Sequence, residues 1–400
     1  DLIIEVKDEV TPQGPFLVTF GNSDSNSSTQ LALEALRTDS AVLTAEPVFT
    51  IQTKAVGKLE PNDSGYPFQK KALELIGMPT AWAITVGKPS VCVAVLDTGI
   101  FAAHKDLKDN LLPGYDFIDN DTDPSAPPTF ENGKTSTHGT HVAGTVAALG
   151  NNRFGVVGVA FKSRVVPVRV IGTGGTQFTV VKAIRWAAGL PVTGVPDNEN
   201  ACKVINMSLG FISKGNCTAG PFPSIQEAVD AAEAAGVVVV AAAGNEAQAC
   251  PAPQSSAPAN LNNVISVAAV TPSGERAVYS NEAPTNWIAA PGGSATIESE
   301  QIASTTFTGD GAARKDHYKF MPGTSMASPH VAGVVALMLS VNPNLTPAEV
   351  RDILARTADD KGAVGRDNIF GYGIIRADKA VQAAGNTSPP AGRQFAGRYT

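Results

Sequence analysis

The sequence predicts an α/β protein with a doubly wound, mostly parallel sheet and helices on both faces, preceded by a small α+β segment. Two observations favour this fold class. Between residues 67 and about 385, continuous apolar runs typical of strands buried on both faces alternate with helical patterns. Such alternation indicates parallel strands joined by right-handed crossovers. Residues 1–60 lack the alternation and combine short strand and helix patterns instead.

The N-terminal segment predicts a small unit of its own. Its patterns are typical of strand, helix and two further strands at 16–20, 31–37, 41–43 and 48–51. A stretch at 55–66, rich in Gly, Pro, Asn, Asp and Ser, is typical of an exposed linker. The sequence therefore predicts three parts: residues 1–60, a larger α/β domain over 61–385, and a flexible tail over 386–400.

The α/β region carries its elements in alternating order. Strands are predicted at 91–96, 164–170, 204–209, 236–243 and 264–270. Helices are predicted at 138–147, 179–188, 224–235 and 323–340. Ligands of such sheets bind at the carboxyl ends of the strands. Asp97, Ser208 and Gly244 lie at such ends, and a long polar insertion occupies 293–320.

Composition and charge narrow the class of protein. The chain has 400 residues, 43% of them hydrophobic, enough for a large core and a second small domain. Its formal net charge of -7 argues against a nucleic acid or an anionic membrane as partner. No apolar run reaches the length of a transmembrane span. The chain starts at Asp1 without a basic and apolar leader, so we expect a secreted monomer whose signal peptide has been removed.

Ser325 sits just before a predicted buried helix, in a stretch at 323–340 that begins with a small-residue turn. Free backbone N–H groups and the positive end of the helix dipole lie at such a position. An N-cap is the commonest role of a serine there. The alternative is a nucleophile whose developing oxyanion is stabilised by those donors.

A nucleophilic serine needs a base, and the base needs a third group that fixes its tautomer. His138 stands at a helix start behind small residues, where its ring can face a cleft. Asp97 ends a buried strand, where a carboxylate is costly unless it is hydrogen-bonded. We expect Asp97 to accept the N–H of His138, and His138 to take the proton of Ser325. A cap of the following turn is the simpler role of Asp97, but all three residues lie at element ends flanked by glycine.

Three blocks give the chain its resemblance to the subtilisin-like serine peptidases, or subtilases. They are the Asp97 block at 95–100, the His138 block at 138–144 and the Ser325 block at 323–330. The order Asp, His, Ser along the chain is that of subtilisin. A fourth block at 242–246 matches the family's oxyanion-hole asparagine, here Asn245. The resemblance covers about residues 67–385.

The resemblance implies a secreted serine endopeptidase that hydrolyses peptide bonds through an acyl-enzyme. It also implies two edges that hydrogen-bond an extended peptide, formed by Gly174, Gly175 and Thr176 and by Ser208, Leu209 and Gly210. Gly210 and Gly244 would leave the first specificity pocket wide between them, which favours large apolar residues before the cut, and Ala243 is a further expected substrate-binding residue. Glu246 at the rim of this pocket would also tolerate a basic residue. Taken alone, such glycines more often form ordinary turns.

A structural calcium site is a further implication of the resemblance. The matching positions, the apolar ones through their backbone carbonyls, are Asp106, Leu149, Asn152, Phe154 and Val156. Oxygen ligands of this kind suit Ca2+, a hard cation. Gly150 is an extra residue in this loop, and a surface turn built on its asparagines is the alternative.

The four cysteines are even in number and contain no C-x-x-C pair, which permits two disulfides. In the subtilisin-like fold, Cys92 and Cys202 begin neighbouring strands. Cys217 and Cys250 follow the segments near the substrate pocket. We expect disulfides in the pairs Cys217–Cys250 and Cys92–Cys202, although parallel neighbours meet disulfide geometry only in some registers.

Residues 1–60 resemble the end of a subtilase propeptide, which packs on the catalytic domain, assists folding and inhibits the site until it is removed. A permanent N-terminal extension is an equal alternative. The expected partners are protein or peptide substrates, with the N-terminal segment as inhibitor. The alternative function is a latent zymogen or a binding protein of the same fold. A nucleotide-binding protein is disfavoured because no G-x-G-x-x-G fingerprint follows the first strand.

Overall fold

The computed structural model describes residues 2–6, 16–18, 34–38, 42–47, 57–127, 136–211, 217–309 and 313–386. The chain forms two compact units, Asp1–Ala55 and Val56–Thr400, which are described separately. In the first unit, strand β1 (Leu2–Val6) pairs antiparallel with β2 (Phe16–Val18) and with β3 (Val42–Pro47). A helical segment spans 34–38. The strand predicted at 48–51 and the tail after residue 386 lie outside the described residues.

The second unit is built on a seven-stranded sheet in which each pair of neighbouring strands is parallel. The strands are β4 (Cys92–Asp97), β5 (Tyr115–Asp116), β6 (Arg164–Arg169), β7 (Val204–Met207), β8 (Val238–Ala242), β9 (Val264–Val270) and β10 (Asn286–Pro291). Their order is β10-β9-β8-β7-β4-β6-β5, so the strand order changes direction beside β4. Ligands of α/β sheets bind at the carboxyl ends of strands beside such a point, and Asp97 ends β4.

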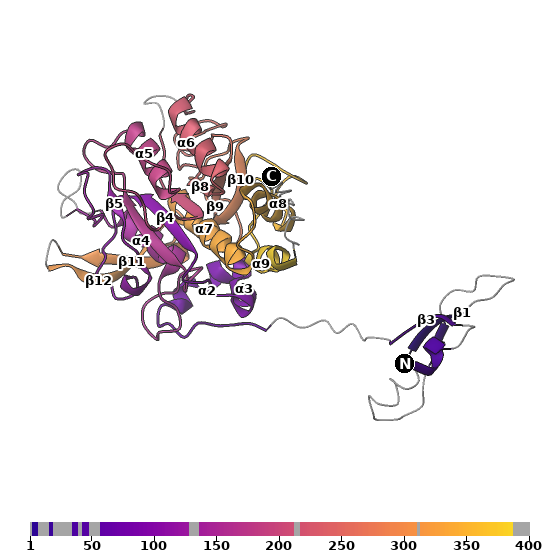
Figure 1. Ribbon diagram of the computed structural model, residues 1–400. Coiled ribbons are helices and arrows are strands. Elements are labelled where there is room, and N and C mark those ends of the chain that lie inside the picture. The colour runs from indigo at the N-terminus through magenta and orange to yellow at the C-terminus, as the bar shows by residue number, and fades with distance from the viewer. Residues whose placement is uncertain are drawn as a thin grey trace, which may run out of the picture. The chain divides into compact units, whose positions relative to one another are not determined.

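Helices cover both faces of the sheet (Figure 1). Helices α4 (His138–Ala147) and α7 (Thr324–Val341) share one core with the sheet, and α5 (Gln177–Ala187) and α6 (Pro223–Ala234) share the other. Alternate residues of β4 point into the two cores. Val93 and Val95 pack in the first core, and Ala94 and Leu96 pack in the second. Because both faces are covered, the central strands are mostly apolar. The predicted fold class is confirmed.

Helix α7 is the central helix of the first core. Its length and apolar composition alone would allow it to cross a membrane, but 89% of this stretch is buried inside the protein. It packs against β7, β8, β9 and β10. The stretch is therefore a core helix, as predicted, but the helix begins at Thr324, so Ser325 lies in its first turn and not just before it.

Several elements are not predicted by the sequence. They are α2 (Tyr66–Leu75), α3 (Met78–Ile84), α8 (Pro347–Thr357), α9 (Ala377–Asn386), strands β1, β5 and β10, and the 3-10 helices η1 (Lys108–Asn110) and η3 (Glu298–Glu300). The insertion at 293–320 contains most of an antiparallel hairpin of β11 (Ile302–Thr308) and β12 (Lys315–Met321). The hairpin lies at the outer edge of the second unit, with β11 packed against α4 (Figure 1).

Candidate active site

The expected acid and base meet at the carboxyl end of the sheet. Asp97 is the last residue of β4, and His138 is the first residue of α4. Nδ1 of His138 lies 2.7 Å from Oδ1 of Asp97, and it donates because an ionised carboxylate can only accept. The backbone N–H of Thr98 donates to the same oxygen at 2.7 Å. The side chain of Asp97 is 1% exposed and that of His138 is 25% exposed, so the imidazole reaches the surface while its partner is buried.

The surroundings of His138 shift its proton affinity. Burial opposes protonation, but the charge of Asp97 and the hydrogen bond to it outweigh burial and raise the pKa of the imidazole above its ordinary value. His138 therefore holds a proton more tightly than a free histidine does. This property suits a base that must take a proton from a hydroxyl.

Thr98 fixes the start of the helix that carries His138. Its Oγ1 accepts from the backbone N–H of Gly139 at 3.0 Å, so a side chain at the end of β4 holds the first turn of α4. Residue 139 must be small, because a Cβ there would lie 2.5 Å from the backbone oxygen of Gly99. Both Thr98 and Gly139 lie in the blocks that suggest the family, but the contact between them is not predictable from the sequence.

Ser325 lies in the first turn of α7. The turn into the helix depends on Gly323, whose φ of +149° favours glycine. The hydroxyl of Ser325 donates to the backbone oxygen of Ser208 at 3.3 Å. Within the described residues, no hydrogen bond joins this hydroxyl to His138. Catalytic hydrogen bonds are often long or poorly aligned without substrate and tighten when substrate is bound.

Asn245 is held by one end of its amide. Its Oδ1 accepts from the backbone N–H of Thr324 at 2.9 Å and from the hydroxyl of Thr324 at 3.0 Å. The hydroxyl of Thr324 in turn accepts from the backbone N–H of Gly244 at 3.1 Å. Oδ1 is thus occupied, and Nδ2 is the end of the amide left to donate to a ligand. The backbone N–H of Ser325, in the first turn of α7, is a second such donor.

The two expected peptide-binding edges lie on either side of one pocket of about 320 Å³. Gly175 and Thr176 line it from one side, and Leu209 and Gly210 line it from the other. The other lining residues are Val170, Ile171, Gly172, Val180 and Phe211, so the pocket is largely apolar. One member of each edge lies outside the lining: Gly174, with a φ of +91°, in the first edge, and Ser208 in the second.

Two of the expected substrate-pocket glycines also have packing roles. A Cβ at Gly244 would overlap the amide of Asn281 and the carboxylate of Glu246, and a Cβ at Gly210 would overlap the hydroxyl of Ser256. Nδ2 of Asn281 donates to the backbone oxygen of Ala243 at 3.0 Å and to Oε2 of Glu246 at 2.6 Å. Glu246 therefore has a protein partner, Asn281, which the sequence does not predict.

A model of the subtilase family matches residues 88–373, a range that includes Asp97, His138, Asn245 and Ser325. The chain belongs to the subtilase family. This membership confirms the predicted family, the subtilisin-like serine peptidases, and the predicted subtilisin-like fold.

Relatives of this subtilase include several proteases. It is 44% identical to an extracellular protease of Xanthomonas campestris pv. campestris, over 76% of this chain and 53% of the relative. It is 38% identical to the extracellular basic protease of Dichelobacter nodosus, over 82% of this chain and 57% of the relative. A solved protease structure from Pseudoalteromonas arctica PAMC 21717 is 41% identical, with a TM-score of 0.71 over 81% of this chain and 99% of that chain. The chain spans only about half the length of the two curated extracellular proteases.

Calcium binding is general among subtilases, but the groups around Asp106 do not form a cation site as they are arranged. Oδ1 of Asp106 accepts from Nδ2 of Asn152 at 2.7 Å. Oδ2 accepts from the backbone N–H of Val156 at 2.9 Å and from the hydroxyl of Tyr318 at 3.3 Å. Burial raises the pKa of this carboxyl to about 6. The side chain of Asn152 therefore presents a donor to the carboxylate in place of an oxygen atom to a cation.

The remaining expected calcium ligands also use their N–H groups. Leu149 donates its backbone N–H to the backbone oxygen of Asp106 at 2.8 Å, and Phe154 donates to Oδ1 of Asn152 at 2.8 Å. In the described part of the chain, no group of three His, Cys, Asp or Glu residues could hold a metal ion. Calcium therefore stays a prediction, and no step of the reaction is assigned to it.

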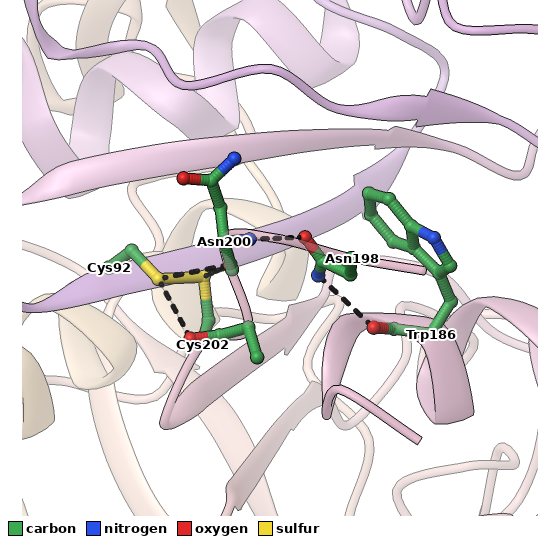
Figure 2. Close-up of a disulfide and its surroundings, with 6 residues drawn as sticks. Cys92, Trp186, Asn198, Asn200 and Cys202 are labelled. Carbon is green, nitrogen blue, oxygen red and sulfur yellow. Dashed lines mark hydrogen bonds between the residues drawn. A yellow bond between two sulfur atoms is a disulfide. The ribbon is translucent and has the colours of Figure 1, made fainter. Parts of the chain in front are cut away.

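Both expected cysteine pairs are disulfides in this subtilase. Cys92 and Cys202 are joined with their Cα atoms 5.1 Å apart, at the amino end of the sheet, opposite the edge with Asp97 (Figure 2). Cys217 and Cys250 are joined with their Cα atoms 5.6 Å apart. The Cys217–Cys250 disulfide links the segment that follows β7 to the segment that follows Asn245. It therefore ties together two segments that border the candidate substrate site.

Proposed function

We propose that this subtilase is a secreted serine endopeptidase that cleaves peptide bonds through an acyl-enzyme on Ser325. The observation that carries the proposal is the 2.7 Å contact between buried Asp97 and partly exposed His138, at the same edge of the sheet as Ser325. The names of the two extracellular relatives support secretion.

In the first half of the reaction, His138 takes the proton of the Ser325 hydroxyl as Oγ attacks the carbonyl carbon of the scissile bond. Asp97 keeps Nδ1 of His138 protonated, so that Nε2 is the basic nitrogen. The oxyanion that forms is stabilised by Nδ2 of Asn245 and the backbone N–H of Ser325. His138 then gives its proton to the leaving amine as the carbon–nitrogen bond breaks.

In the second half, His138 takes a proton from water, and the hydroxide attacks the acyl carbon. The same two donors stabilise the second oxyanion, and His138 returns the proton to Oγ of Ser325 as the ester bond breaks. The proton of Ser325 leaves on the amine product and is replaced by a proton from water, so Asp97, His138 and Ser325 end as they began.

The substrate in this proposal is an extended peptide held between Gly174–Thr176 and Ser208–Gly210. Peptides that add as a strand use backbone hydrogen bonds for affinity and pockets for alternate side chains for specificity. The apolar lining of the pocket between the edges supports a broad preference for large apolar side chains. The hydrogen bond between Glu246 and Asn281 argues for a weaker preference for basic residues.

A second candidate function is a latent form of the same enzyme. It is favoured by the compact N-terminal unit, which has its own antiparallel sheet and is separate from the α/β unit. We infer that this unit inhibits the site until it is removed, and that calcium, if bound, stabilises the folded enzyme only.

Labelling with a fluorophosphonate before and after limited proteolysis tests both candidates. Immediate labelling that is lost in a Ser325→Ala variant supports the active peptidase. Labelling that appears only after residues 1–60 are cleaved supports the latent form. Absence of labelling in both states refutes the peptidase proposal.

A further inference from the structure

Ser208 contacts Ser325 in two ways: its backbone carbonyl accepts from the hydroxyl of Ser325, and its own hydroxyl contacts the backbone oxygen of Ser325. Its Oγ lies 2.8 Å from the backbone oxygen of Ser325, 2.9 Å from Oγ of Ser328 and 3.0 Å from Nδ2 of Asn206. The residue is 3% exposed, so these protein groups are the partners of its hydroxyl.

The chemistry of the three partners fixes the direction of these hydrogen bonds. A serine hydroxyl has one proton to donate and two lone pairs to accept with. Nδ2 of Asn206 can only donate, so it occupies one lone pair. The backbone oxygen of Ser325 can only accept, so it receives the single proton of Ser208. Ser328 then donates to the second lone pair, and the hydroxyl of Ser208 uses its full capacity.

Pro329 explains why the backbone oxygen of Ser325 needs this donor. In an α-helix, the N–H of residue 329 would donate to the oxygen of residue 325, four positions earlier. Proline has no N–H, and Pro329 lies buried inside α7. The hydroxyl of Ser208 therefore stands where the helix's own hydrogen bond is missing, in the turn that carries the candidate nucleophile.

We infer that Ser208 is a positioning residue that replaces the helical hydrogen bond removed by Pro329. It thereby holds the backbone of Ser325 in place. The Oγ and the backbone N–H of Ser325 are the groups that act on the substrate. The role rests on the proposed peptidase function and goes beyond the peptide-binding edge expected at Ser208, because it belongs to the hydroxyl and not to the backbone. Ser208 acts through Ser325 and touches no reacting atom with its side chain.

A double-mutant cycle with Pro329 tests the role. Ser208→Ala leaves the oxygen of Ser325 without a donor, and we expect kcat and the rate of fluorophosphonate labelling to fall about tenfold with little change in KM. Pro329→Ala supplies the missing N–H. In that background, Ser208→Ala should therefore lower both rates by less than about threefold. Equal losses in the two backgrounds overturn the inference.

Ser340→Ala is the matched control. Its hydroxyl donates to the backbone oxygen of Ala336 at 2.7 Å in the same helix, where an ordinary helical N–H is also present. We expect this variant to keep wild-type rates, and an equal loss of rate there would show that any buried hydroxyl of α7 has the same effect.

Thermal unfolding of the four proteins of the cycle gives a readout that does not depend on activity. Ser208→Ala should lower Tm when Pro329 is present, and should lower it much less in the Pro329→Ala background. This expectation holds even if the wild-type protein is not labelled and the proposed function fails. If Ser208→Ala alone does not fold, folding of the double variant supports the inference, and failure of both overturns it.

Discussion

Replacing Asn245 by Leu and by Asp separates the two ends of its amide. Leu removes both ends, whereas Asp keeps an oxygen for Thr324 and removes only the Nδ2 donor. Loss of one oxyanion-hole donor costs about 2.7–4 kcal/mol, a magnitude measured in subtilisin itself. We therefore expect both variants to lower kcat at least about a hundredfold with little change in KM.

The two variants should differ in stability. Thr324 is fully buried, and Leu leaves both its N–H and its hydroxyl without their acceptor at Oδ1. Two lost hydrogen bonds of about 0.5–1.5 kcal/mol each predict a loss of about 1–3 kcal/mol for Leu, against a small change for Asp. Steady-state kinetics on a peptide substrate and urea unfolding measure the two effects. A kcat within tenfold of wild type for the Asp variant would refute the role of Nδ2.

Three further predictions concern pH and metal. Because the pKa of His138 is raised and the base must be neutral, kcat/KM should fall in acid with a midpoint above about 6.5, and a midpoint below 6 in the pH profile contradicts this. Burial lowers the pKa of His141 to about 3, so its contribution to stability is present above about pH 6.5 and is lost by about 1 kcal/mol per pH unit as pH falls toward 3. Urea unfolding of His141→Gln should show a flatter dependence over that range, and an unchanged slope counts against His141 as its source. The calcium prediction expects EDTA to lower Tm and Ca2+, but not Mg2+, to restore it; a Tm that EDTA leaves unchanged contradicts a structural calcium site.

The places of Asp97, His138 and Ser325 could be predicted because a parallel sheet brings its strand ends to one edge. A strand buried on both faces is a continuous apolar run, so the residue after the run lies at that edge. The helix behind Ser325 is predictable for the same reason, since α7 is buried along nearly its whole length and is mostly apolar. These elements depend on burial, which a hydrophobic pattern reports directly.

The contacts that support the site could not be predicted, because they join polar groups far apart in the chain. Asn281 lies beside Gly244, and Ser256 lies beside Gly210. Thr324 holds Asn245 across 79 residues. Such pairs have no periodicity, and each partner alone resembles an ordinary surface residue. Their positions are determined by the packing of loops that only the folded sheet brings together.

Strand β11 shows how a buried element can have a polar sequence. Ser304, Thr305 and Thr306 are at most 1% exposed, yet their hydroxyl groups make the insertion at 293–320 resemble a surface loop. Ser304 donates to the backbone oxygen of His141 at 2.7 Å, and Thr305 donates to that of Thr140 at 2.8 Å. The hydroxyls of Ser304 and Thr305 pair with a helix, a form of burial that hydrophobicity does not report.

The same contacts connect the hairpin to the candidate base. Nε2 of His141 lies 2.9 Å from the backbone oxygen of Ile302 and 3.1 Å from that of Lys319, one on each strand of the hairpin. Hydroxyls of β11 donate to the first turns of α4, and a side chain of α4 donates back to the hairpin. Because His138 begins α4, its position against Asp97 depends on this reciprocal pairing as well as on Thr98. The insertion is thus a support of the helix that carries the base, although its sequence resembles that of a surface loop.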